Sequence, residues 1–422
     1  MLPMRKLLLA SLIASTLCAC GAGSDSGDGS PISASGLPTP SPTPSPTPSP
    51  TPSPTPSPTP SPTPSPTPTP VPPAPPPPVV TPAWVSNLAI GQWAQIPNTA
   101  ISGVEPSPVP PGNGPRFKVD GWNSFVVDTR TSTVYSVANG GHADYAGNEV
   151  DALNLEVAQP QWVQKVAPTP SGQLGPGGQD FYPDGRPASR HSYYGVVLNA
   201  SDDRIMLFGG AIWGTQGGFG NATSSYNITG NFYSTSSTHP DIPGAPTAGA
   251  YSLNPLTGDI YMNINWTLYR WNRSANTWST LNPTGSPSNG YYTMSAMDPS
   301  RGRIFFLGGP DANHHLYTIA NNAWAAVTLG GSNAGDVAAA EEAAMFYVPA
   351  FDRFLVRKAA AGGTVYIIDP QTFAVTTLAT TGGGSIPGTV NGPFNKFLYV
   401  PRLGGAVYVP TYSGNAWFLR LH

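Results

Sequence analysis

A hairpin pattern that recurs roughly every 50 residues constrains the fold of this chain more than any other feature. In each copy, an apolar strand is followed by a turn of Pro, Asp, Asn or Gly and then by a second apolar strand. The six copies read SFVVDTRTSTVYSVANGG from Ser124, YGVVLNASDDRIMLFGG from Tyr194, GAYSLNPLTGDIYMNIN from Gly249, TMSAMDPSRGRIFFLGG from Thr293, AMFYVPAFDRFLVRKA from Ala344 and KFLYVPRLGGAVYVPT from Lys396.

Two further strands follow most of these hairpins. Third strands are predicted at 148–156, 266–274, 314–322, 363–371 and 415–422. Fourth strands are predicted around Trp162, Trp278, Trp324 and Phe373. Four antiparallel strands in each repeat are typical of a β-propeller blade.

The two ends of the repeat region predict how the ring closes. The sixth repeat stops at its third strand at His422, whereas the segment 91–99 resembles the fourth strands of other repeats. We therefore expect an N-terminal strand near Trp93 to complete the last blade, which removes exposed sheet edges. The predicted fold is all-β, a propeller of six four-stranded blades. Seven blades are the alternative, because 100–120 and 215–247 are irregular enough to contain further strands.

The region 84–422 resembles the kelch repeat and, more broadly, the central domain of galactose oxidase. Glycine pairs end the second strand at Gly140-Gly141, Gly209-Gly210 and Gly308-Gly309, and a tryptophan follows later in most repeats. The resemblance implies a propeller but no particular function. Galactose-oxidase copper chemistry needs a tyrosine crosslinked to a cysteine, and no cysteine follows Cys20. We predict no cofactor and no metal site.

The N-terminus reads as an export signal. Arg5 and Lys6 precede a short apolar run, so residues 1–19 are predicted to be a signal peptide. The sequence Leu17-Cys18-Ala19-Cys20 resembles the bacterial lipobox, with Cys20 as the lipidated residue. Because Gly21 rather than Asp follows Cys20, the predicted location is the outer membrane, on its periplasmic side or at the cell surface.

A spacer follows the predicted anchor and carries no chemistry. Residues 37–82 are nearly all Pro, Thr and Ser. Since proline fixes φ and removes a hydrogen-bond donor, this run is expected to form an extended polyproline rod. The predicted domains are therefore the signal peptide, a stalk over 20–83 and a propeller over 84–422.

Charge and cysteine content exclude several classes of function. The net charge is −3 and only 10% of residues are charged, so a basic nucleic-acid binder is excluded. The only cysteines, Cys18 and Cys20, belong to the predicted signal and anchor, which excludes thiol chemistry in the propeller. The predicted partners are a glycan or an envelope protein, and the membrane through Cys20.

Blade topology places two polar loops together. In a four-stranded blade, the loop between the second and third strands opens on the same face as the loop that enters the next blade; we call this the loop face. On it we predict catalytic side chains at His142, Arg190, His191 and Tyr193. Predicted ligand-binding residues are Asp144, Tyr145, Asn148, Glu149, Trp213, Trp266, His314 and His315, with the last two facing the others across the axis.

These residues leave three functions open. The first is binding of a glycan or protein through the loop face. The second is a polysaccharide lyase, because some secreted seven-bladed lyases of uronate polymers use His and Tyr with a cation on the carboxylate. The third is an envelope scaffold. Structural roles are also open: Arg190 in an ion pair with Asp144 or Glu149, and His191 as a satisfied buried histidine.

Overall fold

The computed structural model describes residues 78–214, 218–244, 248–309 and 312–422. All of them belong to the second of the chain's two units, Val71–His422. The predicted signal peptide, the predicted lipidation site at Cys20 and most of the predicted stalk lie outside the described residues. In the described ranges, no helix is both long and apolar enough to cross a membrane.

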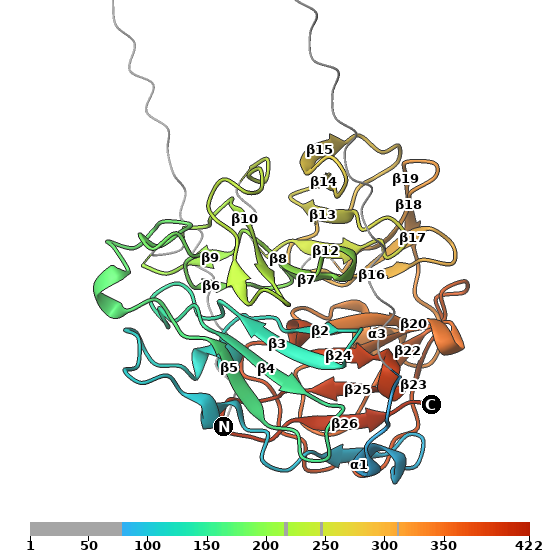
Figure 1. The fold of residues 1–422 in the computed structure, drawn as a ribbon. Coiled ribbons are helices and arrows are strands. Elements are labelled where there is room, and N and C mark those ends of the chain that lie inside the picture. Colours follow the sequence, from blue (N-terminus) through green and yellow to red (C-terminus); the bar gives the residue numbers. More distant parts are fainter. Residues whose placement is uncertain (1–77, 215–217, 245–247, 310–311) are drawn as a thin grey trace, which may run out of the picture. The chain divides into compact units, whose positions relative to one another are not determined.

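Six antiparallel sheets of four strands form a ring, so the predicted six-bladed propeller is confirmed (Figure 1). The first three blades, from the axis outward, are β2 (Val126–Asp128), β3 (Thr133–Val137), β4 (Val150–Asn154) and β5 (Trp162–Val166); β7 (Val196–Asn199), β8 (Arg204–Phe208), β10 (Thr223–Asn227) and β11 (Phe232–Tyr233); and β12 (Ala250–Leu253), β13 (Ile260–Ile264), β14 (Thr267–Asn272) and β15 (Thr277–Leu281).

The remaining blades are β16 (Met294–Asp298), β17 (Arg303–Leu307), β18 (His314–Thr318) and β19 (Ala323–Val327); β20 (Ala344–Val348), β21 (Arg353–Arg357), β22 (Tyr366–Ile368) and β23 (Val375–Thr377); and β24 (Phe397–Val400), β25 (Gly405–Tyr408), β26 (Trp417–Arg420) and β1 (Trp93–Gln95). The strands β2, β7, β12, β16, β20 and β24 contact one another in sequence around the ring, which makes them the innermost strands.

Short elements lie between the blade strands, some of them linking two blades and others within a single blade. They are β6 (Arg190–His191) and β9 (Ala211–Ile212), the helices α1 (Ala83–Ser86), α2 (Phe117–Asp120) and α3 (Ala334–Ala338), and the 3-10 turns η1 (Ile101–Val104), η2 (Ser171–Gln173), η3 (Ala200–Asp202), η4 (Pro349–Phe351), η5 (Phe394–Lys396) and η6 (Pro401–Leu403). On the loop face, the short strands β6 and β9 pair with each other and join the segments of blades one and two.

The ring closes as predicted. β1 pairs with β26 in antiparallel register, with Trp93 opposite Leu419 and Gln95 opposite Trp417. The N-terminal strand therefore supplies the fourth strand of the blade that the C-terminus leaves incomplete.

Two details of the prediction change. The irregular segment 215–247 contains β10 and β11, which complete blade two, and 100–120 forms η1 and α2, so the described residues hold no seventh blade. Phe373 lies just before β23 rather than in it, with a left-handed φ of 54°.

The first hairpin of every blade turns through a left-handed residue at or near the start of its second strand. These residues are Ser132, Asp203, Gly258, Gly302, Asp352 and Gly404. Positive φ is unfavourable for most side chains but tolerated by Gly and Asp. The Asp and Gly residues of the repeat are thus explained by turn geometry rather than by chemistry. We call the face where these six turns open the hairpin-turn face.

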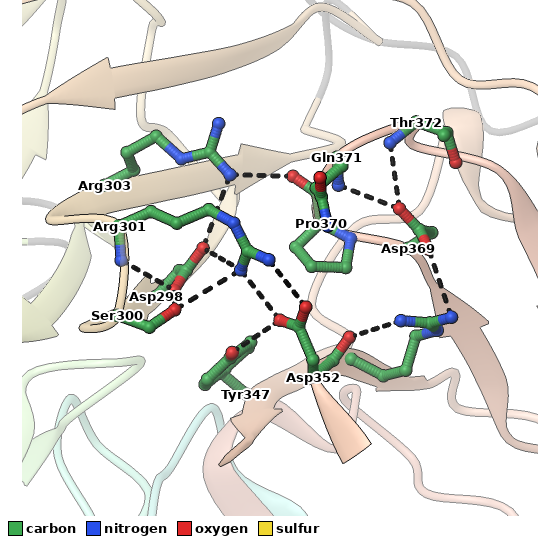
Figure 2. Close-up of polar contacts among 11 residues, drawn as sticks. Asp298, Ser300, Arg301, Arg303, Tyr347, Asp352, Asp369, Pro370, Gln371 and Thr372 are labelled. Atoms are coloured by element: carbon green, nitrogen blue, oxygen red, sulfur yellow. Dashed lines mark hydrogen bonds and ion pairs between the residues drawn. The ribbon is translucent and has the colours of Figure 1, made fainter. Parts of the chain in front are cut away.

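Ion pairs join neighbouring blades at the hairpin-turn face. They connect Arg130 to Asp203, Arg273 to Asp202, Arg301 to Asp352 and Arg402 to Glu156, at distances of 2.5–2.7 Å. Figure 2 shows the most branched of them, in which Arg301 lies between Asp298 of its own blade and Asp352 of the next. Tyr347 also donates a hydrogen bond to Asp352. These partly exposed pairs fix the orientation of adjacent blades more than they add stability.

Candidate functional site

Two glycine pairs bring the loops of blades one and two against His191. β6 pairs with β9, with His191 opposite Ala211. Gly141 (φ 81°) and Gly210 (φ 90°) lie so close to the backbone of His191 that a Cβ on either would collide with it. The double glycines of the repeat are therefore required here for close backbone approach.

An Asp–His pair forms at this contact. The Nε2 of His191 lies 2.9 Å from Oδ2 of Asp144, a carboxylate that also accepts a hydrogen bond from Asn113. Burial lowers the pKa of His191, and the bond to Asp144 offsets only part of this effect. Partial burial alone would raise the pKa of Asp144, but the bond to His191 helps to hold it below its ordinary value. The pair is therefore a neutral imidazole that donates to a carboxylate.

This bond defines the free nitrogen of His191. A neutral imidazole carries one N–H, so donation from Nε2 leaves a lone pair on Nδ1. Nδ1 is buried and has no hydrogen-bond partner among the described residues. His191 is thus oriented by Asp144 in the way that a general base is oriented in hydrolases, although it lies beneath the surface.

Aromatic rings and one further acid surround this pair. Relative to the ring of His191, the centroids of His142, Trp122 and Tyr193 lie at 4.6, 5.2 and 6.2 Å. We define the loop-face cluster as Trp122, His142, Asp144, His191, Tyr193, Phe219, Tyr292, Glu342 and Phe394.

The cluster gathers on the axis because its members come from the loops that enter the innermost strands. Trp122, Tyr193, Tyr292, Glu342 and Phe394 precede β2, β7, β16, β20 and β24. Across the ring, Trp122 Nε1 donates to Glu342 Oε1 at 2.9 Å, and Tyr193 packs 6.0 Å from both Tyr292 and Phe394. Residues of five blades thus form one site.

Backbone strain is concentrated in the same cluster. His142, Tyr193, Tyr292, Glu342 and Phe394 all have φ between 39° and 54°. Positive φ in non-glycine residues is uncommon, and such strained positions collect where structure serves function. His191, Tyr193 and Phe394 are buried, while Trp122, His142, Phe219, Tyr292 and Glu342 are partly exposed. The exposed members form an aromatic and acidic rim over a buried floor.

A buried lysine supports this rim. Lys396 Nζ donates to the carbonyl oxygens of Val119 (3.0 Å) and Gly121 (3.3 Å), the turn that carries Trp122. Burial lowers the pKa of Lys396 to about 7, although the charges of Asp120 and Glu342 oppose the shift. Burial also raises the pKa of Glu342. These groups place Trp122 and Glu342 beside one another.

Four of the predicted residues belong to the cluster: His142, Asp144, His191 and Tyr193. Arg190 does not belong to it. We predicted that its guanidinium would face a ligand, and this prediction is wrong. Its side chain is buried and donates to the carbonyl oxygens of Ala188, Gly209 and Asp180. Its nearest carboxylate is that of Asp180, at 4.0 Å, so the alternative pairing with Asp144 or Glu149 is also wrong.

Three predicted ligand-binding residues lie inside blade one instead. Asn148 accepts a hydrogen bond from the backbone of Thr169 and donates to Pro187, as expected for a loop-bracing amide. Tyr145 donates to Glu149 Oε1 at 2.8 Å, and Glu149 pairs with Lys118 at 3.0 Å. None of the three reaches the loop-face cluster.

The other four predicted ligand-binding residues also lie outside the loop-face cluster. Trp213 is partly buried against the small apolar cluster that contains Leu174 and Tyr182. Trp266 is 51% exposed in the turn between β13 and β14, where its backbone N–H donates to the carbonyl oxygen of Asn289. His314 and His315 start β18, in agreement with the predicted third strand at 314–322, and His314 Nδ1 accepts a hydrogen bond from the backbone N–H of Gly308 in its own blade. The side chains of both histidines therefore contact other residues of blade four and not residues across the axis.

The fold and the cluster together define a six-bladed propeller with an aromatic and acidic site where its axis meets the loop face. A scan against protein-family models finds no match for this chain, and a search of curated proteins finds no similar sequence. Within the described residues, no three His, Cys, Asp or Glu side chains are arranged to hold a metal ion.

Proposed function

We propose that this protein is a lipid-anchored envelope protein whose propeller binds a neutral glycan at the loop-face cluster. The observation that carries the proposal is the rim of Trp122, Phe219 and Tyr292 beside the carboxylate of Glu342. Aromatic faces with a few convergent polar groups are the usual composition of a small-ligand site. Sugar rings stack on such faces, and carboxylates accept hydrogen bonds from their hydroxyl groups.

Charge favours a neutral over an acidic glycan. Asp144, Glu341 and Glu342 lie on the loop face, whereas Arg190 is enclosed by protein and Lys396 is buried. Carboxylates repel a uronate polymer, and a guanidinium that is enclosed cannot bind its carboxyl group. The proposed ligand is therefore a neutral oligosaccharide.

Replacement of Tyr292 by alanine is expected to weaken glycan binding about tenfold or more, because it removes a central aromatic contact. Binding is measured by calorimetry and by intrinsic tryptophan fluorescence, to which Trp122 contributes. The ligands are cello-, xylo- and chito-oligosaccharides and fragments of alginate and pectate. The matched control is Phe232→Ala, an exposed aromatic on the outermost strand β11, which should bind as the wild type does. Binding of acidic fragments alone, or equal effects of the two variants, contradicts the proposal.

Membrane attachment is tested at Cys20. We expect the wild-type protein expressed in a Gram-negative host to incorporate labelled palmitate and to enter the detergent phase of Triton X-114. The Cys20→Ser variant should do neither, because the thiol that accepts the lipid is lost. Cys18→Ser is the control and should behave as the wild type. Lipid attachment that depends on Cys18 instead would refute the assignment.

Acid–base catalysis on a polysaccharide is the second candidate function. The Asp144–His191 pair favours it, because it leaves a lone pair on Nδ1 of His191 next to Tyr193 and His142. In a β-elimination, His191 would take the C5 proton next to the uronate carboxyl group. The C4–O bond would break as the C4=C5 double bond forms, and Tyr193 would donate a proton to the leaving oxygen. With Arg190 enclosed by protein, His142 is the member of the predicted catalytic set left to contact the uronate carboxyl group.

We expect any such activity to fall about 10²–10⁴-fold in His191→Ala, the range typical of a lost general base. The assay follows the absorbance of unsaturated uronate ends with alginate, pectate and glucuronan. Asp144→Asn should lower kcat and shift the pH profile while leaving KM nearly unchanged, because Asp144 orients His191 without touching the substrate. The absence of signal from the wild-type protein on all three polymers excludes this lyase function.

A further inference from the structure

A second ligand site lies inside the ring, away from the loop-face cluster. Two adjoining cavities of about 330 and 480 Å³ share six lining residues: Thr129, Tyr251, Leu253, Pro255, Asn395 and Leu398. One is lined by β2, β7 and β12, and the other by β12, β16, β20 and β24. Together they form one axial tunnel enclosed by all six innermost strands.

The wall of this tunnel is apolar. Each innermost strand contributes an apolar side chain: Val127, Val197, Leu253, Ala296, Phe346 and Leu398. No Asp, Glu, His, Lys or Arg is among the described residues that line either cavity. Protein cavities of ~300–1,000 Å³ with predominantly apolar walls are typical small-molecule sites.

The tunnel has one polar end and one closed end. At the hairpin-turn face its mouth is formed by turn residues, among them Pro299, Pro349 and Pro401. Tyr347 lines the tunnel and donates to Asp352 of the interblade ion pairs (Figure 2), so charged groups border the mouth. Toward the loop face, the buried rings of Tyr194 and Phe394 pack 4.9 Å apart.

We infer that the axial tunnel binds the hydrocarbon chain of a single-chain amphiphile, such as a fatty acid, with its polar head at the hairpin-turn face. The innermost strands have three to five residues, so the tunnel is on the order of 10–17 Å deep. Each innermost strand lines this depth with an apolar side chain, so the tunnel suits one extended hydrocarbon chain better than a fused ring system. The apolar wall and charged rim match the two parts of such a molecule.

A fluorescent dansyl fatty acid tests this inference on the full chain, with octanoate, dodecanoate and palmitate as competitors. We expect saturable binding with one probe per chain and tighter competition as the acid lengthens, because each added methylene group leaves water. Ala296→Phe narrows the tunnel and should weaken binding at least about tenfold, the effect of excluding about two methylene groups.

The matched control is Val163→Phe, which adds a similar ring at an exposed position of the outer strand β5. It should bind the probe as the wild type does, and so should Tyr292→Ala in the loop-face cluster. If Ala296→Phe does not fold, Val197→Phe replaces it. The inference is overturned by an absence of saturable binding, by wild-type affinity in a folded tunnel variant, or by preference for pyrene over the acyl probes.

Discussion

Replacing Lys118 with methionine is expected to lower the free energy of unfolding by about 3–5 kcal/mol, because it leaves two buried carboxylates without a counter-charge. Lys118 Nζ lies 3.0 Å from Glu149 Oε1 and 2.8 Å from Asp151 Oδ2, and each of these side chains is at most 1% exposed. Urea denaturation at neutral pH measures the loss.

The buried group of Lys118, Glu149 and Asp151 has two carboxyl groups but only one ammonium group. Glu149 Oε2 and Asp151 Oδ1 have no hydrogen-bond partner among the described residues. Burial raises the pKa of Asp151 to about 7, although Lys118 opposes the shift. The folded state therefore holds a proton on Asp151 that the unfolded chain has already released at mildly acidic pH.

The sign of the pH effect follows from this raised pKa. The stability that Asp151 contributes is present at low pH and is lost as pH rises from its unfolded pKa toward 7. Asp151→Asn should remove this dependence and cost less than Lys118→Met, because the Lys118–Glu149 pair remains. The control is a triple variant that combines Lys118→Met with Glu149→Gln and Asp151→Asn, and it should recover much of the stability lost in Lys118→Met. A loss below about 1 kcal/mol in Lys118→Met would contradict this account.

The repeat made most of the fold predictable, because strand alternation and turn chemistry are local properties. The hairpin turns are specified by a few Asp, Asn, Gly and Pro residues, so each of the six hairpins was found within a few residues of its bounds. The third and fourth strands of blade two were missed for a physical reason. β10 reads Thr-Ser-Ser-Tyr-Asn, and its Ser224 and Ser225 are buried where an apolar residue is usual. Ser225 is satisfied instead by backbone and side-chain contacts with Ser234 and His239.

The meeting of His142 with His191 was predictable from topology, but the orientation of Arg190 was not. The two residues Arg190 and His191 form the short strand β6, and successive strand residues point to opposite sides. When His191 faces Asp144, Arg190 must face the interior. Nothing in the surrounding sequence resembles a strand, so this alternation appears only once β6 pairs with β9.

Residues from distant blades complete the site. Trp122 and Glu342 are 220 positions apart, yet they share a hydrogen bond because both enter innermost strands at the axis. The sequence does contain a signal for them, because both residues come a few positions before a predicted first strand, where the chain enters the ring at the axis. Tyr292 and Phe394 satisfy the same rule.

Closure of the ring by β1 provides the second large effect. Trp93→Ala is expected to destabilise the protein by about 3–5 kcal/mol, the usual cost of truncating a buried tryptophan. Trp93 is 2% exposed, donates to the carbonyl oxygen of Gly363 at 3.0 Å and packs 5.8 Å from the ring of Phe397. One side chain thus joins the closing strand, blade five and blade six.

The environment of Trp93 has no means of refilling the space that alanine leaves. Gly363 and Gly383 carry no side chain and contact the indole through their backbones. Arg357 is buried with its guanidinium 5.5 Å from the indole, so the truncation also exposes this charge to an empty space. Trp93→Phe keeps most of the packing, loses the hydrogen bond to Gly363 and should cost about 1–2 kcal/mol.

Urea denaturation compares these variants with Trp266→Ala, which removes the same ring from an exposed turn and should change stability by less than about 0.5 kcal/mol. Limited proteolysis adds a local readout, because a weakened β1 should release the segment 91–99 for cleavage before the other blades open. Equal stability losses in Trp93→Ala and Trp266→Ala, with 91–99 still protected, would mean that β26 and blade five hold the ring closed without this side chain.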